Sequence, residues 1–200
     1  MQKIPTMFVR DETVKGHPVT DQIKPECQWV LDGEGIATVK LDGTNVKVEN
    51  GQLFKRQKPK EADYDDAAYV PCDRSNPADR WAFEAFNAGH QGNGIYELVG
   101  PKVQGNPQGH ASHTLVKVVP FLPRLGAIDS EVRSVFYGRT FDGLKRWLLD
   151  HRVEGIVFHH PDGRMAKIKR RDFGLPWPMK RSGEPASVDA VVPGSGVSNA

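Results

Sequence analysis

The chain has 200 residues, 38% hydrophobic and 26% charged, with a formal net charge of +2 at neutral pH. This length and composition favour one main domain of a soluble globular protein, large enough to bury a core. No apolar run suggests a membrane span or a cleavable signal. Two cysteines, Cys27 and Cys72, argue against a disulfide framework, and no Cys/His spacing indicates a zinc site. We therefore expect a reducing, intracellular compartment, the cytoplasm.

The first predicted elements are strands. Residues 7–10 form a short apolar run, and the run from Trp29 to Leu31 and then from Ile36 to Val39 also predicts strand. Residues 45–49 alternate between polar and apolar side chains up to the turn Asn50-Gly51. Lys40 is therefore expected in a tight connection between two strands of a hairpin.

The sequence Lys40-Leu41-Asp42-Gly43 in this connection could carry chemistry. A lysine attacks phosphorus only as the neutral amine, which a free lysine with a pKa of about 10.4 rarely is at pH 7. A site that holds other cations, or that strips water from the amine, favours the neutral form. Asp42 could orient the amine or a sugar hydroxyl, and Gly43 allows a close backbone approach. The alternative is a surface hairpin with a solvated lysine.

The middle of the chain alternates strands with one helix. Residues 52–60 predict a strand that runs into a basic loop, and Arg56 could return to the Lys40 pocket across the hairpin. The acidic residues 61–66 predict a solvated loop. Asn76-Pro77 starts a helix through Phe86, with Trp81, Ala85 and Phe86 as core residues. Residues 95–100 predict an apolar strand whose carboxylate, Glu97, either faces solvent or serves a site.

The last third predicts a loop, a strand, a helix and a hairpin. Residues 100–109 form a Gly/Asn/Pro-rich loop before a strand at 114–119. Thr140 can cap a helix that ends near Asp150. Residues 154–160, the Pro161-Asp162-Gly163 turn and residues 165–169 predict a hairpin. Because strand side chains alternate, Lys167 and Lys169 share one face, whereas His159 and His160 point to opposite faces and argue against a joint metal site.

Basic residues gather near the end of the chain. Between Arg164 and Arg181 there are seven lysines and arginines against one acid, Asp172, which indicates phosphate-bearing partners or a solubilising face. Residues 182–200 are rich in Ser, Gly, Pro and Val and predict a disordered tail after a domain spanning residues 1–181.

Several of these motifs, in this order, resemble the motif series of the covalent nucleotidyltransferases, which include ATP-dependent DNA and RNA ligases and mRNA capping guanylyltransferases. More narrowly, the chain is similar over most of residues 4–178 to the vertebrate 5′-3′ RNA ligase family with a Lys-x-Asp-Gly-Thr motif. Val39 departs from the acid that many relatives have before the lysine. The segments that carry the resemblance are residues 4–9, Lys40 to Thr44, Arg56, Tyr96 to Gly100, Gln104 to Pro107, and Glu154 to Pro178.

The resemblance implies an α+β fold: an ATP-grasp-like nucleotidyltransferase domain of antiparallel sheets flanked by helices, without an OB domain. It implies that Lys40 forms a lysyl-AMP intermediate and that Glu154, together with Glu97, holds Mg²⁺, with Mn²⁺ as an alternative. Lys40, Lys167, Lys169 and Glu154 would be catalytic. Residues in contact with ATP would be Thr38, Lys40, Asp42, Gly43, Arg56, Glu97, Glu154, Lys167 and Lys169.

The implied function is an ATP-dependent RNA ligase that joins RNA 5′-phosphate and 3′-hydroxyl ends, acting without a membrane and without an evident obligate protein partner. A minimal ATP-dependent DNA ligase is one alternative, and a capping guanylyltransferase is another. A module that only binds RNA through the basic segment of residues 164–181 is an alternative of a different class.

Overall fold

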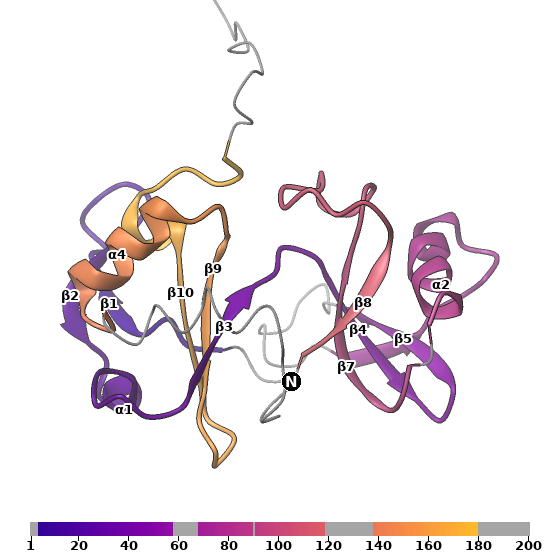
Figure 1. The fold of residues 1–200 in the computed structure, drawn as a ribbon, viewed down its shortest axis with the longest axis horizontal. Helices are drawn as coiled ribbons and strands as arrows, with labels where there is room; N and C mark the ends of the chain where they lie inside the picture. Colours follow the sequence, from indigo (N-terminus) through magenta and orange to yellow (C-terminus); the bar gives the residue numbers. More distant parts are fainter. Residues whose placement is uncertain (1–3, 58–67, 90, 119–137, 180–200) are drawn as a thin grey trace, which may run out of the picture.

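The computed structural model describes residues 4–57, 68–89, 91–118 and 138–179. In this part of the chain, three antiparallel sheets and three short α-helices make an α+β protein. The elements divide into two lobes, each with its own apolar core (Figure 1). The expected acidic loop at residues 61–66 and the expected tail at 182–200 lie outside the described residues.

The first lobe, called here the three-stranded lobe, is built on the sheet order β10-β9-β3. Its buried side chains include Ile156 and Phe158 of β9 and Ile168 of β10. A hairpin of two short strands and two helices complete the lobe. Its elements are β1 (Phe8–Arg10), β2 (Val19–Ile23), η1 (Pro25–Cys27), α1 (Gln28–Leu31), β3 (Ile36–Lys40), α4 (Phe141–Asp150), β9 (Gly155–His159), β10 (Met165–Lys169) and η5 (Arg170–Phe173).

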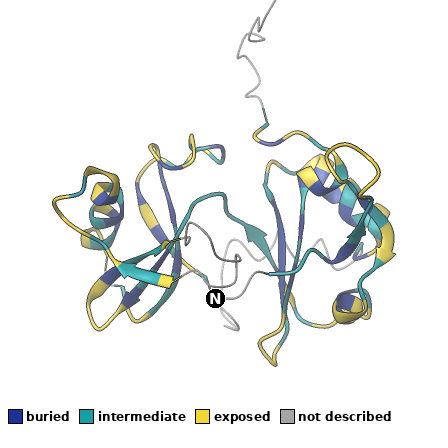
Figure 2. Ribbon diagram, turned by 180° about the vertical axis from the view of Figure 1, so that it is seen from behind, coloured by how far each residue is buried: buried dark blue, intermediate teal, exposed yellow. Residues whose placement is uncertain are grey.

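The second lobe, called here the five-stranded lobe, has the sheet order β6-β5-β4-β7-β8. One face of this sheet packs against α2, whose Ala82 and Ala85 are buried with Val46 and Val48. Figure 2 shows α2 and α4 buried on one side and exposed on the other. The elements of the lobe are β4 (Thr44–Glu49), β5 (Gln52–Gln57), β6 (Ala68–Pro71), η3 (Pro77–Asp79), α2 (Arg80–Asn87), β7 (Gly94–Val99) and β8 (Thr114–Lys117).

The predicted hairpin around Lys40 is wrong. Strand β3 pairs with β9, whereas β4 pairs with β5 and β7, so Leu41 to Gly43 carry the chain from one sheet to the other. Strand β3 contributes to the core of the three-stranded lobe, and β4 contributes to the core of the five-stranded lobe. Two paired strands of one hairpin would share the same core. At the crossing, a Cβ on Gly43 would lie 2.2 Å from the carbonyl oxygen of Leu98, so only glycine permits this approach.

The expected strand at Trp29 to Leu31 is also wrong, because these residues lie in α1. Trp29 and Val30 are adjacent in sequence and both buried, which an alternating strand does not allow for one covered face. The Trp29 indole N–H donates to the carbonyl of Glu26, 3.0 Å away, and this bond closes the turn. The short apolar run is therefore a buried helical turn.

Other local predictions are confirmed. The Thr140 hydroxyl caps α4 by accepting a hydrogen bond from the Gly143 amide, and β9 and β10 form the predicted antiparallel hairpin. The turn at Asn50-Gly51 joins β4 to β5 with both residues at positive φ. None of the helices in the described ranges has the length and apolar character needed to cross a membrane.

Candidate active site

Lys40 lies where the two lobes meet, as the last residue of β3. Its Nζ atom is 2.5 Å from Oε2 of Glu154, the residue just before β9, and it also donates to the Leu41 carbonyl. The Lys40 side chain is 25% exposed and that of Glu154 is 12% exposed. The alternative of a solvated surface lysine is therefore wrong, because the amine is tied to a carboxylate 114 residues away.

Burial shapes the acid–base properties of Glu154. Loss of water around its carboxylate raises the pKa of Glu154, and the negative charge of Asp42 adds to this effect. The positive charges of Lys40 and Lys169 act in the opposite direction. The carboxylate thus lies among two cations and a second acid, in surroundings that hydrate it poorly.

Glu97 approaches the same lysine from the other lobe. Burial raises the pKa of Glu97 to about 7, although Lys40, a hydrogen bond from Asn45 and the backbone N–H of Gly43 all favour its ionised form. Asn45 is the direct partner of Glu97 in the pairing of β4 with β7. The predicted strand carboxylate is therefore poorly hydrated and feels the charge of Lys40, rather than facing open solvent.

Three further predicted residues share the sheet face that carries Lys40. Lys40 and Lys169 both pair with Gly155, one from each side, so their side chains flank a residue without one. Thr38 and Lys167 flank Val157 in the next row, and Thr38 Oγ1 lies 2.9 Å from Nε2 of His159. The opposite face packs in the core. The sequence-based prediction that Lys167 and Lys169 share a face is confirmed.

Arg56 lies on the five-stranded sheet, in β5. It pairs with Tyr69 of β6, whose hydroxyl donates to Oδ1 of Asn45 at 2.5 Å. Burial raises the pKa of Tyr69, so the phenol keeps the proton that it donates. A line of polar side chains thus crosses the sheet from Tyr69 through Asn45 to Glu97. Arg56 therefore lies next to this line of side chains. The hairpin across which it was expected to reach Lys40 does not form.

Sequence reasoning missed four side chains that form hydrogen bonds at or near Glu97 and Asp42. Asn45 donates a hydrogen bond to Glu97, and Tyr69 donates one to Asn45. Gln108 accepts a hydrogen bond from the Asp42 amide at 3.0 Å, and the Trp177 indole donates to the Asp42 carboxylate at 2.8 Å. The length of the loop at residues 100–109 was a usable signal for Gln108. Trp177 lies in a segment that carries the family resemblance, but nothing local signalled its bond to Asp42, 135 residues away.

The two carboxylates, Glu97 and Glu154, could bind magnesium only if phosphate oxygens of a substrate supplied further ligands. Among the described residues there is no group of three or more His, Cys, Asp or Glu side chains that could hold a metal ion. Mg²⁺, however, is often bound by one or two carboxylates together with phosphate oxygens and water. Glu97 and Glu154 are two poorly hydrated carboxylates near one lysine, which a cation would stabilise as anions.

The two neighbouring histidines, His159 and His160, have different partners: Thr38 contacts the first, and Glu34 and Asp162 contact the second. His159 is 4% exposed, and burial lowers its pKa. His160 points the other way, with Nε2 2.6 Å from Glu34 and Nδ1 2.7 Å from Asp162.

The chain is thus an α+β protein with a lysine close to two partly buried carboxylates, one contributed by each lobe. Comparison with known families sharpens this class. A model of the RNA ligase 1 family matches residues 87–190, just over half of the chain. The chain belongs to the RNA ligase 1 family, so a ligase is the enzyme class that its membership suggests.

Curated relatives agree with this assignment. The chain is 34% identical over 89 residues to RNA ligase 1 of Danio rerio, 37% over 86 residues to that of Mus musculus and 35% over 89 residues to that of Pongo abelii. Each match covers 42% of this chain. The chain spans only about a quarter of the length of these relatives, 25% in each case.

Proposed function

We propose that this chain is the adenylyltransferase part of an ATP-dependent RNA ligase, with Lys40 as the nucleophile. The observation that carries the proposal is the ion pair of Lys40 with Glu154, beside Glu97, in a member of the RNA ligase 1 family. Its fold would be the ATP-grasp-like nucleotidyltransferase domain within residues 1–181. The antiparallel sheets and the position of Lys40 between them support this assignment.

The first step is transfer of AMP to the enzyme. The Lys40 amine attacks the α-phosphorus of ATP, an N–P bond forms, and the bond to the bridging oxygen breaks with release of pyrophosphate. Only the neutral amine has a lone pair to donate, so the proton that Lys40 shares with Glu154 must leave first. Glu154 at 2.5 Å is placed to receive it.

The sheet face that carries Lys40 would bind the phosphates. Lys169, across Gly155 from Lys40, and Lys167, one row away, offer positive charge where negative charge develops on the α-phosphate. Thr38 and Gly43 would line the nucleotide, and Asp42, oriented by Trp177, would hold a ribose hydroxyl. Glu97 and Glu154 are the residues that would hold Mg²⁺, or Mn²⁺, which would there neutralise phosphate charge.

The second and third steps consume the adenylate. A 5′-phosphate oxygen of RNA attacks the phosphorus of lysyl-AMP and releases the amine of Lys40. A 3′-hydroxyl then attacks the 5′-phosphorus, AMP leaves, and the hydroxyl proton passes to a base or to solvent. Arg56, on the five-stranded sheet, would meet the phosphate of the RNA end.

The test is covalent labelling. Incubation with ATP labelled at the α-phosphate, followed by a denaturing gel, should label the wild-type chain and leave Lys40→Ala unlabelled. Lys40→Arg should fail equally, because a guanidinium is always charged. A label that persists in Lys40→Ala would refute the assignment. Labelling by GTP in place of ATP would indicate a capping-type enzyme, and faster sealing of nicked DNA than of 5′-phosphorylated RNA would indicate a DNA ligase.

A further inference from the structure

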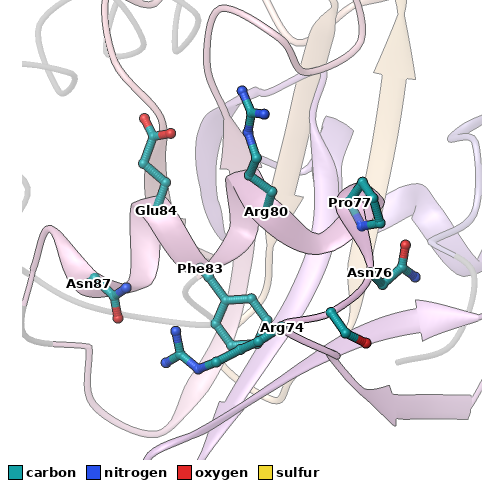
Figure 3. A pocket seen from close by; sticks show the side chains of 8 residues that line it. Arg74, Asn76, Pro77, Arg80, Phe83, Glu84 and Asn87 are labelled. Atoms are coloured by element: carbon teal, nitrogen blue, oxygen red, sulfur yellow. The ribbon is translucent and has the colours of Figure 1, made fainter.

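A pocket lies away from the Lys40 site, at the outer surface of the five-stranded lobe. It has a volume of about 470 Å³ and is formed by the loop before η3 and by one side of α2 (Figure 3). Its wall includes Arg74, Arg80, Phe83 and Glu84. Tyr96 and Leu98 of β7 are buried with Ala82 and Ala85 of α2. Because strand side chains alternate, Glu97 between them points to the opposite face of the sheet. The pocket is therefore separate from the proposed adenylylation site.

The two arginines of this pocket are held by aromatic rings rather than by carboxylates. The Arg74 guanidinium lies 4.3 Å from the centre of the Phe83 ring, and that of Arg80 lies 3.8 Å from the centre of the Trp81 ring. Within the described part of the chain, neither guanidinium has a hydrogen bond or an ion pair. Arg10 and Arg164, in contrast, are both bound to aspartates.

Ring stacking leaves the edge of a guanidinium open. The N–H groups point outward in the plane of the group, which is the arrangement that binds two oxygens of one phosphate. The pocket also contains Glu84, but its Oε1 lies 2.8 Å from Nδ1 of His113. Two guanidiniums and one carboxylate leave the pocket with a net positive charge. Its chemistry is that of an anion site with an aromatic wall.

We propose that Arg74 and Arg80 bind the phosphodiester backbone of an RNA strand. The choice of RNA as the anion rests on the proposed function. Figure 3 shows the two side chains leaving α2 and its preceding loop in different directions, so they would contact different phosphates of one strand. Because the pocket lies on the far side of the sheet, it holds RNA remote from the ends being joined. It contributes affinity and not chemistry.

The test measures RNA binding as a function of salt, without ATP. The probe is a 5′-phosphorylated single-stranded RNA, and the protein is the chain as it stands. The slope of log affinity against log salt should become shallower by about 0.7 for each phosphate that the protein no longer neutralises, and so by about 1.4 in Arg74→Ala/Arg80→Ala. Arg74→Lys/Arg80→Lys should keep the slope of the wild type, with weaker binding, because the charge remains and the bidentate geometry does not.

A matched control distinguishes loss of this pocket from loss of any surface positive charge. Arg146 on α4 is exposed and also has no ion pair in the described ranges, but it lies outside the pocket. Arg146→Ala should leave the salt slope unchanged. An unchanged slope in the double alanine variant, or an equal change in Arg146→Ala, overturns the proposal.

Labelling by ATP distinguishes a failure here from a failure of the proposed function. The double variant should take up the label from ATP at the rate of the wild type, because neither arginine belongs to the Lys40 site. A large loss of labelling in a correctly folded double variant would contradict the assignment of the pocket to RNA affinity alone. If no wild-type label forms, the proposed function fails, while the salt slope still tests the pocket.

Discussion

The two sheet faces that meet at Lys40 are built in different ways. The three-stranded face presents lysines: Lys40 and Lys169 flank Gly155, and Lys167 lies one row away. The five-stranded face presents polar groups already bonded to one another, from Tyr69 through Asn45 to Glu97. The first face concentrates positive charge suited to a phosphate, whereas the second holds one carboxylate in a fixed orientation. Lys40 couples the two faces electrostatically, because its positive charge favours the ionised form of Glu97 on the other lobe.

Among these variants, the largest loss of adenylylation is expected at Glu154, which forms an ion pair with Lys40 of the three-stranded face. Glu154→Gln keeps the size of the side chain but removes the charge that balances Lys40 and would hold magnesium. Adenylylation should fall by about 10²–10³-fold, the usual loss of one electrostatic group at a reacting centre. Single-turnover labelling measures the rate, and circular dichroism checks the fold. Unchanged labelling at saturating magnesium would remove Glu154 from the mechanism.

Removal of the titrating group at Glu97 should change how stability depends on pH. The ordinary pKa is 4.5 and the folded pKa is about 7, so the folded protein binds this proton more tightly than the unfolded chain. Stability from this group is present below pH 4.5 and is lost as pH rises through 7. Glu97→Gln should therefore flatten the fall in stability across this window, by on the order of 1–3 kcal/mol.

Urea unfolding of the ligand-free protein at a series of pH values measures this change. Glu49→Gln, at an exposed carboxylate at the end of β4, is the control and should leave the slope across this window as it is in the wild type. Parallel curves for the wild type and Glu97→Gln would show that the carboxylate is well hydrated in the fold.

The two lysines of β10 should differ in importance. Lys169 shares a row with Lys40 and acts on Glu154, whereas Lys167 lies one row away. Lys169→Ala should slow adenylylation by roughly 10²-fold, and Lys167→Ala by less, because the strength of a charge falls with distance. Rates of label uptake from ATP decide the order. The reverse order would mean that the α-phosphate lies over Val157 instead of Gly155.

The smallest effect is expected on the five-stranded face. Tyr69→Phe removes the hydrogen bond to Asn45, at a cost of about 0.5–1.5 kcal/mol of stability. Asn45 would then hold Glu97 less firmly, so the pKa of Glu97 should rise and the acid side of the adenylylation profile should move to higher pH. Tyr96→Phe is a control, since that hydroxyl donates to the Gly92 carbonyl, away from Glu97. A profile that does not move would make the bond purely structural.

Local patterns predicted much of the fold. The Thr140 cap, the β9–β10 hairpin and the shared face of Lys167 and Lys169 all follow from residues close together in the chain. Of the three expected core residues, Ala85 is buried, and Trp81 and Phe86 are partly buried and pack against the core. Periodicity failed at Trp29 to Leu31, where three apolar residues were too few to distinguish a helical turn from a strand.

The sequence by itself determined which residues are candidates for the chemistry: a lysine at the end of a strand, two carboxylates and two lysines on one strand face. Only the tertiary structure decided that β3 and β4 belong to different sheets and that Glu154, 114 residues away, pairs with Lys40. The same holds for the bonds of Asn45 with Tyr69 and of Asp42 with Trp177. Secondary structure follows from interactions within a few residues, whereas these partners meet because two separate cores bring distant strands together.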